Sequence, residues 1–291
     1  MKLIAKLFLI GIIMFIIGYC LFYFTKGITQ DPDGIIATTP FEKHIQELTN
    51  KEVKGLPYDS ARSGFLSIMG EIQTEASIVM NDSSVILSDE EIERCKQIVF
   101  SEYFIIFNGY SKPFFGKSEW DDGVLKRIKT EAQELINMNL AQHDSEVYKD
   151  LKEIVQTVDD YYKAWEIANN ASRCISVQDI AITKKNADKY KKVPLTNNIL
   201  LLGALNSAEQ NAKKSVINNI VSYCNSIINN WNNYSDYIAW NNDYEKACNR
   251  IRFYTDKYNY TRELRDARSR LDLKDTEALR YYTELEQNNN E

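Results

Sequence analysis

The sequence is poor in proline, glycine and histidine. Its 291 residues include 5 prolines, 11 glycines and 2 histidines. Folds that need frequent tight turns, such as sandwiches and loop-rich disulfide scaffolds, are therefore disfavoured, and collagen is excluded. After Gly123 the chain contains only one further glycine, Gly203, and one proline, Pro194. Long helices are expected over that part of the chain.

Motifs of the familiar enzyme classes are also missing. The sequence has no P-loop, no G-x-S-x-G elbow, no H-E-x-x-H and no C-x-x-C. A formal net charge of −6 disfavours a nucleic-acid partner, because phosphate backbones attract basic surfaces. We therefore expect no nucleic-acid partner, no cofactor and no metal. The sequence assigns no catalytic residue, although an active site built from scattered residues stays open.

The sequence does contain a long apolar segment near its start. Residues 7–24 carry no charged side chain and lie between Lys6 and Lys26. This length suits a helix that crosses a hydrocarbon core of about 30 Å. A removed signal peptide, the alternative, would have a shorter apolar region and a cleavage site of small residues. We predict that residues 1–26 form an uncleaved transmembrane signal anchor, with residues 7–24 in the lipid bilayer.

The charges that flank this segment predict its orientation. Lys2 and Lys6 precede it, whereas Asp31 and Asp33 follow soon after Lys26 on the other side. Cytoplasmic flanks of membrane helices carry the excess of basic residues. We therefore expect a single-pass membrane protein with a cytoplasmic N-terminus and an extracytoplasmic body.

The body is predicted to be all-α, because 44% of the residues are hydrophobic and turn-forming residues are few. Residues 27–57 hold three of the five prolines and are predicted to form a membrane-proximal linker with one short helix at about 41–49. Residues 58–287 are predicted to form one elongated helical bundle domain with coiled-coil-like seams. Residues 288–291 are expected to be a frayed tail.

The first part of the predicted bundle carries clear helix signals. Apolar residues recur at three- and four-residue intervals over residues 61–79, which is typical of an amphipathic helix. Ser88 and Glu91 have the spacing of a capping box at the start of the next helix. Asn108 and Gly109 are typical of a helix end, so a loop is expected after them.

Two further amphipathic patterns follow. A helix over residues 119–140 would turn inward Leu125, Ile128, Ala132 and Leu135. Over residues 147–168 the apolar positions alternate spacings of four and three: Val147, Leu151, Ile154, Val158, Tyr161, Trp165 and Ala168. This pattern is the seam of a supercoiled pair or bundle, which must be buried against another helix. The spacing leaves open whether that helix belongs to the same chain.

The helix breaks of the last part are harder to place. A short helix is expected over residues 176–191, and an apolar stripe runs through residues 217–231. A second pattern over residues 240–258 is out of phase with that stripe, so we expect a turn or a stutter near residues 237–242. Asn242 would then start a new helix, and one unbroken helix is the alternative.

The final helix is predicted to begin at an acidic cap. Asp272 or Asp275 is expected to occupy the N-cap position, with Leu279, Tyr282 and Leu285 following on one face.

The cysteines leave the redox state open. Cys20 lies in the apolar segment, and the other four could form two disulfides in three pairings: Cys95, Cys174, Cys224 and Cys248. Three of these four lie on apolar helical stripes, where a reduced cysteine acts as a small hydrophobic residue. We therefore favour reduced core cysteines.

Both histidines occur in the pattern H-x-x-E, as His44 with Glu47 and His143 with Glu146. Di-iron bundles use the reverse order, so this pattern predicts no metal site.

Two acidic pairs are candidates for acid and base catalysis: Asp121 with Asp122, and Asp159 with Asp160. Adjacent residues of a helix point about 100° apart, so neither pair is predicted to be a preformed dyad.

Three surface features could contact a partner. Five lysines form a basic patch: Lys184, Lys185, Lys189, Lys191 and Lys192. Four arginines alternate with acids and are predicted to form a salt-bridged face: Arg262, Arg265, Arg268 and Arg270. Aromatic residues between Tyr223 and Tyr260 fit either a glycan-stacking surface or a helical core, and we favour the core. Tyr234 and Tyr260 are the expected exposed contacts among them.

These observations favour a membrane-anchored extracytoplasmic helical protein that acts as a non-enzymatic interaction or scaffold module at the cell envelope. Its protein partner is unknown, and a second copy of the chain is one candidate. A helical sensor or ligand-binding module that works through a partner is the first alternative. A cell-wall enzyme that uses scattered carboxylates is the second.

Overall fold

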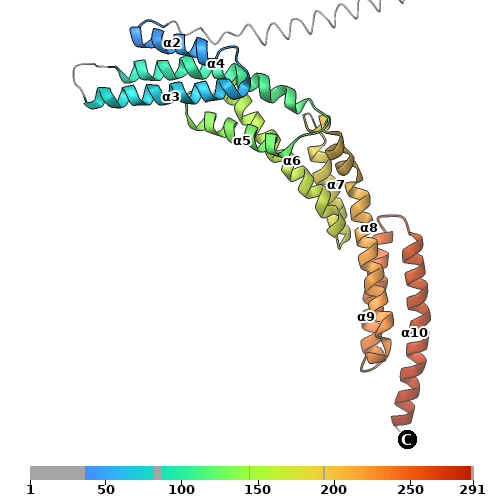
Figure 1. Ribbon diagram of the computed structural model, residues 1–291. Helices are drawn as coiled ribbons and strands as arrows, with labels where there is room; N and C mark the ends of the chain where they lie inside the picture. The colour runs from blue at the N-terminus through green and yellow to red at the C-terminus, as the bar shows by residue number, and fades with distance from the viewer. Residues whose placement is uncertain (1–36, 82–86, 144, 193, 290–291) are drawn as a thin grey trace, which may run out of the picture. The chain divides into compact units, whose positions relative to one another are not determined.

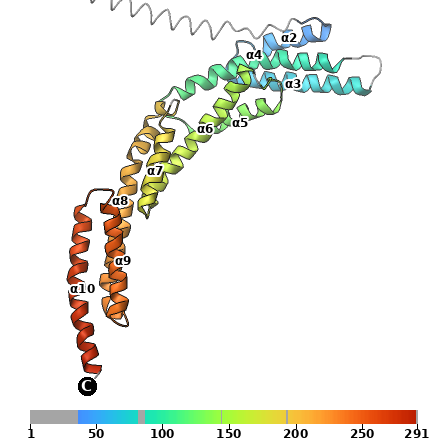
Figure 2. The same cartoon turned by 180° about the vertical axis from the view of Figure 1, so that it is seen from behind.

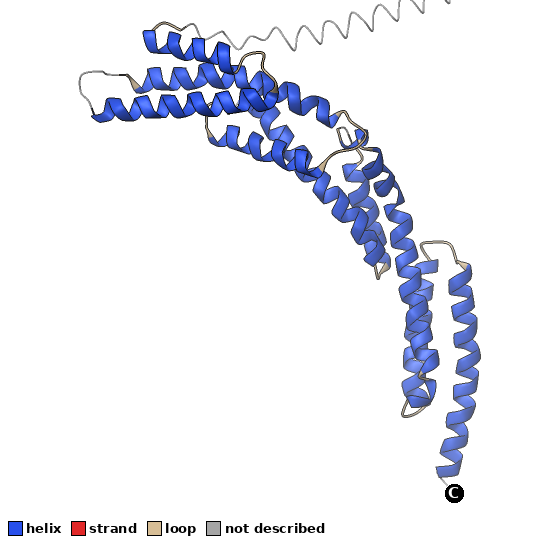
Figure 3. Cartoon of the chain, in the orientation of Figure 1, coloured by secondary structure: helices blue, strands red, loops and turns tan. Residues whose placement is uncertain are grey.

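The computed structural model describes residues 37–81, 87–143, 145–192 and 194–289 (Figure 1). Over these residues the chain forms nine α-helices and three short 3₁₀ helices, with no strand (Figure 3). The prediction of an all-α chain is confirmed. The predicted membrane segment, residues 7–24, lies outside the described residues. Among the described helices, none is both long enough and apolar enough to cross a bilayer.

The chain divides into two compact units. Unit 1 comprises Met1–Lys112 and Glu134–Lys149, and unit 2 comprises Pro113–Gln133 and Asp150–Glu291. The sequence pattern predicted a single bundle domain over residues 58–287. Helical periodicity does not indicate where one core ends and the next begins, because α4, α5 and α6 each contribute residues to both units.

Unit 1 is built around α2 (Pro40–Glu52), α3 (Tyr58–Asn81) and most of α4 (Asp89–Phe115). Helix α2, predicted as a short helix in a linker, packs against α3 and buries Ile45 and Val53 completely. It is therefore part of the core of unit 1.

Helix α3 confirms the amphipathic pattern predicted for it. Its buried positions follow the predicted spacing: Ala61, Phe65, Ile68, Met69 and Ile72. The ring of Phe65 stacks on Tyr103 of α4 with centroids 4.3 Å apart. Aromatic pairs at this distance add to the stability that burial provides.

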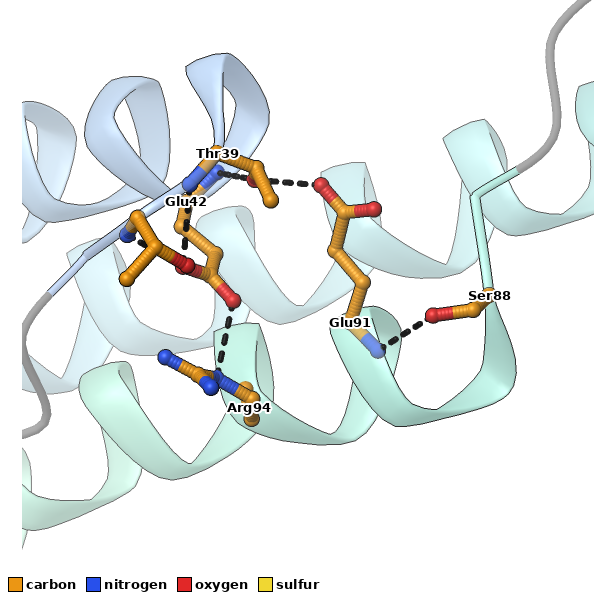
Figure 4. A network of polar contacts seen from close by, with 6 residues as sticks. Thr39, Glu42, Ser88, Glu91 and Arg94 are labelled. Atoms are coloured by element: carbon orange, nitrogen blue, oxygen red, sulfur yellow. Dashed lines mark hydrogen bonds and ion pairs between the residues drawn. The ribbon is translucent and has the colours of Figure 1, made fainter.

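A buried polar network joins the start of α2 to α4 (Figure 4). The Glu42 carboxylate, 1% exposed, accepts hydrogen bonds from the Thr38 amide at 2.6 Å and the Thr39 amide at 3.2 Å. It also pairs with Arg94 Nε of α4 at 2.9 Å. These hydrogen bonds and this charge outweigh the desolvation of the carboxyl group and lower the pKa of Glu42. The network fixes α2 to α4.

Helix α4 begins where the capping box predicts. The Ser88 hydroxyl accepts from the Glu91 amide at 3.1 Å. The Glu91 carboxylate also accepts from the Thr39 hydroxyl at the N-cap of α2 (Figure 4). The start of α4 is thereby linked to the start of α2.

The predicted end of α4 at Asn108 and Gly109 is wrong. The helix continues to Phe115, with Pro113 inside it. Phe114 and Phe115 are buried and lie with their ring centroids 6.2 Å and 5.2 Å from that of Trp120. We attribute the continuation to this burial, which favours helix over the local preference of glycine to stop it.

Unit 2 contains α5 (Asp122–Asn137) up to Gln133 and α6 (Glu146–Asn170) from Asp150. The predicted inward positions of α5 are all buried: Leu125, Ile128, Ala132 and Leu135. The predicted seam of α6 is buried at five positions, Leu151, Ile154, Val158, Tyr161 and Ala168, and half-buried at Val147 and Trp165. Tyr162 of α6 donates to Asp122 of α5 at 2.6 Å, so the partner of this helix lies in the same chain.

The longest helix of unit 2 is α8 (Ile199–Asn229), which contacts α7 (Val177–Tyr190), α9 (Tyr237–Thr255) and α10 (Arg262–Asn289). Figures 1 and 2 show α7 beside its first half and α9 beside its second half. The predicted helix over residues 176–191 is confirmed as α7. Its Ser176 and Asp179 form a complete capping box.

The break before α9 lies earlier than predicted. The chain leaves α8 at Asn230 and starts α9 at Tyr237, where the Asp236 side chain accepts from the Ala239 amide at 2.8 Å. Asn242 lies inside α9, so the predicted turn at residues 237–242 is wrong. The change of phase between the two apolar patterns does mark a break between helices, but the new helix is capped by Asp236 and not by Asn242.

Neither Asp272 nor Asp275 caps the last helix, because α10 begins at Arg262. Trp240 Nε1 and the Tyr237 hydroxyl both donate to Asp275, at 2.9 Å and 3.1 Å. Tyr244 donates to Asp272 at 2.8 Å. These acids therefore hold α9 and α10 together. Helix α10 extends to Asn289, so residues 288 and 289 of the predicted tail are helical, and residues 290–291 lie outside the described part.

The four described cysteines are free, as the core interpretation predicted: Cys95, Cys174, Cys224 and Cys248. Burial raises the pKa of Cys224 to about 11 and that of Cys95 to about 12. Cys20 lies outside the described residues.

Candidate ligand-binding site

The candidate histidines make ordinary surface contacts. His44 Nε2 lies 3.0 Å from Glu71 of α3 and not against Glu47. His143 packs edge-on against Tyr148, with centroids 4.6 Å apart. In the described part of the chain, no three side chains of metal-binding type form a cluster.

The adjacent acids face different partners, as their helical spacing predicts. Asp121 accepts from the Val124 amide at the start of α5, whereas Asp122 pairs with Lys126 at 2.7 Å and accepts from Tyr162. In α6, Asp159 pairs with Lys129 at 2.5 Å, and Asp160 lies 3.8 Å from Lys192. Neither pair forms a carboxylate dyad.

Much of the predicted lysine patch is engaged within the chain. Lys184 pairs with Glu209 at 3.2 Å and Lys191 with Asp188 at 2.9 Å. The Lys189 ammonium lies 5.1 Å from the centre of the Tyr190 ring. These contacts engage part of the patch, although the side chain of Lys184 stays 57% exposed beside Glu209.

The arginine face and the aromatic segment follow their predictions in part. Arg262 lies 3.7 Å from Asp266, and Arg268 pairs with Asp272 at 2.8 Å. Trp240 and Tyr254 are core residues, as favoured, and Tyr260 is exposed. The Tyr234 hydroxyl is bound to Asp243 at 3.0 Å, so the expectation of an exposed Tyr234 is wrong.

A different surface of unit 2 has the features of a binding site. A cavity of about 440 Å³ lies where the start of α7 and the end of α9 meet α8. Val177, Val216 and Ile220 form a buried apolar floor. Ile175 and Phe253 form the rim and are 66% and 63% exposed. The cavity therefore combines a buried apolar floor with exposed apolar side chains at its edge.

Two cations line this cavity, Arg250 and Lys257 of the α9 segment. The Arg250 guanidinium stacks on the Tyr223 ring of α8, 3.9 Å from its centre. This cation–π contact holds the group in place and leaves its N–H edge available for an acceptor. Within the described residues, neither cation forms an ion pair with a carboxylate.

A second cavity, of about 590 Å³, shares Lys257 with the first. Its other cations are Lys213 and Lys214 of α8, and its one lining carboxylate is Glu263. Lys213 pairs with Glu209 at 2.7 Å and lies 4.8 Å from the centre of the Tyr258 ring. We call the two cavities together the α8 groove. Its lining is positively charged although the whole chain is acidic.

Comparison with known proteins yields no match: no family model fits the sequence, and no curated protein and no solved structure is similar to it.

Sequence reasoning missed this groove. Phe253 was assigned to a helical core with the aromatic residues around it, and Arg250 and Lys257 belong to no motif. The cavity beside Arg250 takes its lining from the start of α7, the middle of α8 and the end of α9, which lie about 30–40 residues apart in the sequence. One signal was present: Phe253 lies outside the four-three pattern of α9, which indicates a residue that faces away from the core.

Proposed function

We propose that this protein is a non-enzymatic binding module at the cell envelope, held in the membrane by residues 7–24, with its N-terminus in the cytoplasm. Its helical body then lies outside the cytoplasm and binds a ligand in the α8 groove. The observation that carries this proposal is the apolar cavity with two cations, neither of which pairs with a carboxylate of the described residues.

The size and composition of the groove support ligand binding. Ligand sites are concave, have volumes of about 300–1,000 Å³ and combine apolar walls with a few polar groups. The cavity beside Arg250 has a volume of about 440 Å³ and such a lining.

Photo-crosslinking in native membranes tests this function. A benzophenone amino acid in place of Phe253 lies at the rim of the groove, and the same probe in place of Ile238 is a matched control. Both residues belong to α9 and are well exposed, at 63% and 73%. We expect a specific adduct at position 253 and none at position 238. Equal adducts at both positions, or none at either, would reject the proposal.

Self-association as a scaffold is the second candidate function, because α10 exposes three large apolar side chains, Leu273, Tyr281 and Leu285, whose spacing places them within about 120° of one another around the helix. Exposed apolar residues along a helix can form the interface of a dimer. Sedimentation of the purified full chain decides this role. A scaffold predicts a dimer that dissociates when Leu273 and Leu285 are changed to Gln, whereas a strict monomer contradicts it.

A further inference from the structure

The chemistry of the α8 groove indicates the class of its ligand. We infer that the groove binds a small amphiphilic carboxylate, with its apolar tail on Val216, Ile220 and Phe253 and its head group at Arg250 and Lys257. This inference rests on the proposed function and gives it a ligand class.

The apolar part of the groove accounts for the tail. Val216 and Ile220 are almost fully buried and form a floor, while Ile175 and Phe253 stand exposed at its edge. An apolar group placed between them would remove both rim side chains from water, which is favourable. A purely polar ligand would leave this surface uncovered.

The cations account for the head group. The Arg250 guanidinium is fixed on the Tyr223 ring at 3.9 Å, so little conformational freedom is lost when it binds an anion. Its planar fork matches the two oxygens of a carboxylate. Lys257 lines the same cavity and adds a second positive charge.

The nearby start of α7 does not hold the head group. The Asp179 carboxylate already accepts from the Ile175 amide at 3.0 Å and the Ser176 amide at 2.8 Å. A second anion there would be repelled by Asp179. The favourable place for the negative charge is therefore the α9 side of the cavity, at Arg250 and Lys257.

The test is isothermal titration of the full chain in lipid nanodiscs with three probes, with titration of empty nanodiscs subtracted. Phenylbutanoate has a carboxylate and an apolar tail, phenylbutanol has the tail alone, and acetate has the charge alone. We expect phenylbutanoate to bind at least about tenfold more tightly than either of the others. Its affinity should fall as salt is raised, because the cations are partly exposed.

Matched variants of α9 assign the binding to the groove. Arg250→Gln should reduce the preference for phenylbutanoate over phenylbutanol by about tenfold. Arg252→Gln removes an exposed arginine two residues away that does not line the groove, and should leave the preference unchanged. Phe253→Ala should weaken the binding of both phenyl probes to a similar extent, whereas Ile238→Ala should leave their binding unchanged. Arg250→Lys keeps the charge without the fork and should give an intermediate preference.

Equal binding of phenylbutanoate and phenylbutanol, no binding of any probe, or an unchanged preference in Arg250→Gln would overturn the inference. A crosslinked ligand at position 253 together with any of these results would reject the carboxylate class and leave the binding function standing. If photo-crosslinking gives no specific adduct at position 253 and the titration also gives one of these results, both the binding function and the carboxylate class are rejected.

Discussion

At the scale of single residues, the partners of a buried polar group decide whether it stabilises the fold. Glu42 is buried in unit 1 with two backbone amides and the Arg94 guanidinium around its carboxylate. Tyr103 is also buried in unit 1, but its hydroxyl has no hydrogen-bond partner among the residues that the structure describes. Removal of the Glu42 charge should therefore lower the free energy of unfolding, whereas removal of the Tyr103 hydroxyl should not.

Glu42→Gln should destabilise unit 1 by about 1–3 kcal/mol, because the neutral amide of glutamine weakens the buried hydrogen bonds that the carboxylate accepts from the Thr38 and Thr39 amides. Chemical denaturation at neutral pH measures this change. A loss of less than about 0.5 kcal/mol would show that the network contributes little.

The same residue predicts a dependence on pH. The pKa of Glu42 is lowered in the folded chain, so its carboxylate stabilises the fold at pH values above its ordinary pKa of 4.5. This contribution is lost as the pH falls through the lowered folded-state pKa. The difference in unfolding free energy between wild type and Glu42→Gln should therefore shrink from pH 6 towards acid pH. A constant difference would contradict the assignment.

Tyr103→Phe should leave stability unchanged or raise it by up to about 1 kcal/mol, since it removes a buried hydroxyl that lacks a partner. Tyr282→Phe is the matched comparison in unit 2. Its hydroxyl, in a side chain 4% exposed, donates to the carbonyl groups of Trp231 and Tyr234 at 2.9 Å and 3.0 Å. Tyr282→Phe should therefore lower the free energy of unfolding by about 1–3 kcal/mol. Thermal unfolding of both variants checks the contrast, and equal losses would refute it.

At the scale of elements, the close crossing of α2 and α3 depends on one glycine. A Cβ atom at Gly64 would overlap the Glu52 carbonyl oxygen and lie 2.8 Å from its carbonyl carbon. Both are backbone atoms, so the helices would have to separate.

Gly64→Ala is expected to destabilise unit 1 by about 1–3 kcal/mol through this clash. Gly70→Ala is the control on the same helix, where an added Cβ meets no atom within 4 Å. It should stabilise the helix by up to about 1 kcal/mol, because alanine has the higher helix propensity. Urea denaturation of the two variants measures the difference. Equal effects would mean that α2 does not pack closely at this point.

Helices with a continuous apolar stripe were predictable from sequence, whereas several of their ends were not. The inward face of α5 and the seam of α6 follow from spacing alone, since burial of apolar side chains selects that periodicity. The ends depended on contacts distant in sequence. Helix α4 continues past Gly109, where Phe114 becomes buried. Asp275 accepts a hydrogen bond from the Trp240 indole and does not cap a helix.

The candidate site could not be predicted because packing creates it. Val216 and Phe253 are unremarkable apolar residues on separate helices, and only the approach of α9 to α8 makes them two walls of one cavity. The charge of Arg250 becomes informative once the structure places its guanidinium on the Tyr223 ring, where it forms no ion pair with any carboxylate in the described part of the chain.

At the scale of the whole molecule, membrane attachment is the proposal that gives the binding module its location. Residues 7–24 are long and apolar enough for a single span. The protein should therefore stay in the membrane pellet after an alkaline carbonate wash, and deletion of residues 7–24 should release it. Recovery of the intact wild-type chain in the wash would contradict the anchor. A C-terminal reporter that is active only in the cytoplasm should stay inactive, because the body is proposed to lie outside.

Fluorine NMR tests the central claim, that the α8 groove is a binding site, most directly. A fluorinated phenylalanine at position 253 reports on the groove, and the same probe at Ile105, which is 55% exposed in unit 1, reports on a surface outside it. Titration of the full chain with phenylbutanoate should shift the resonance at position 253 in a saturable way and leave the one at position 105 in place. Absence of a saturable shift at position 253, or the same shift at both positions, would contradict the account.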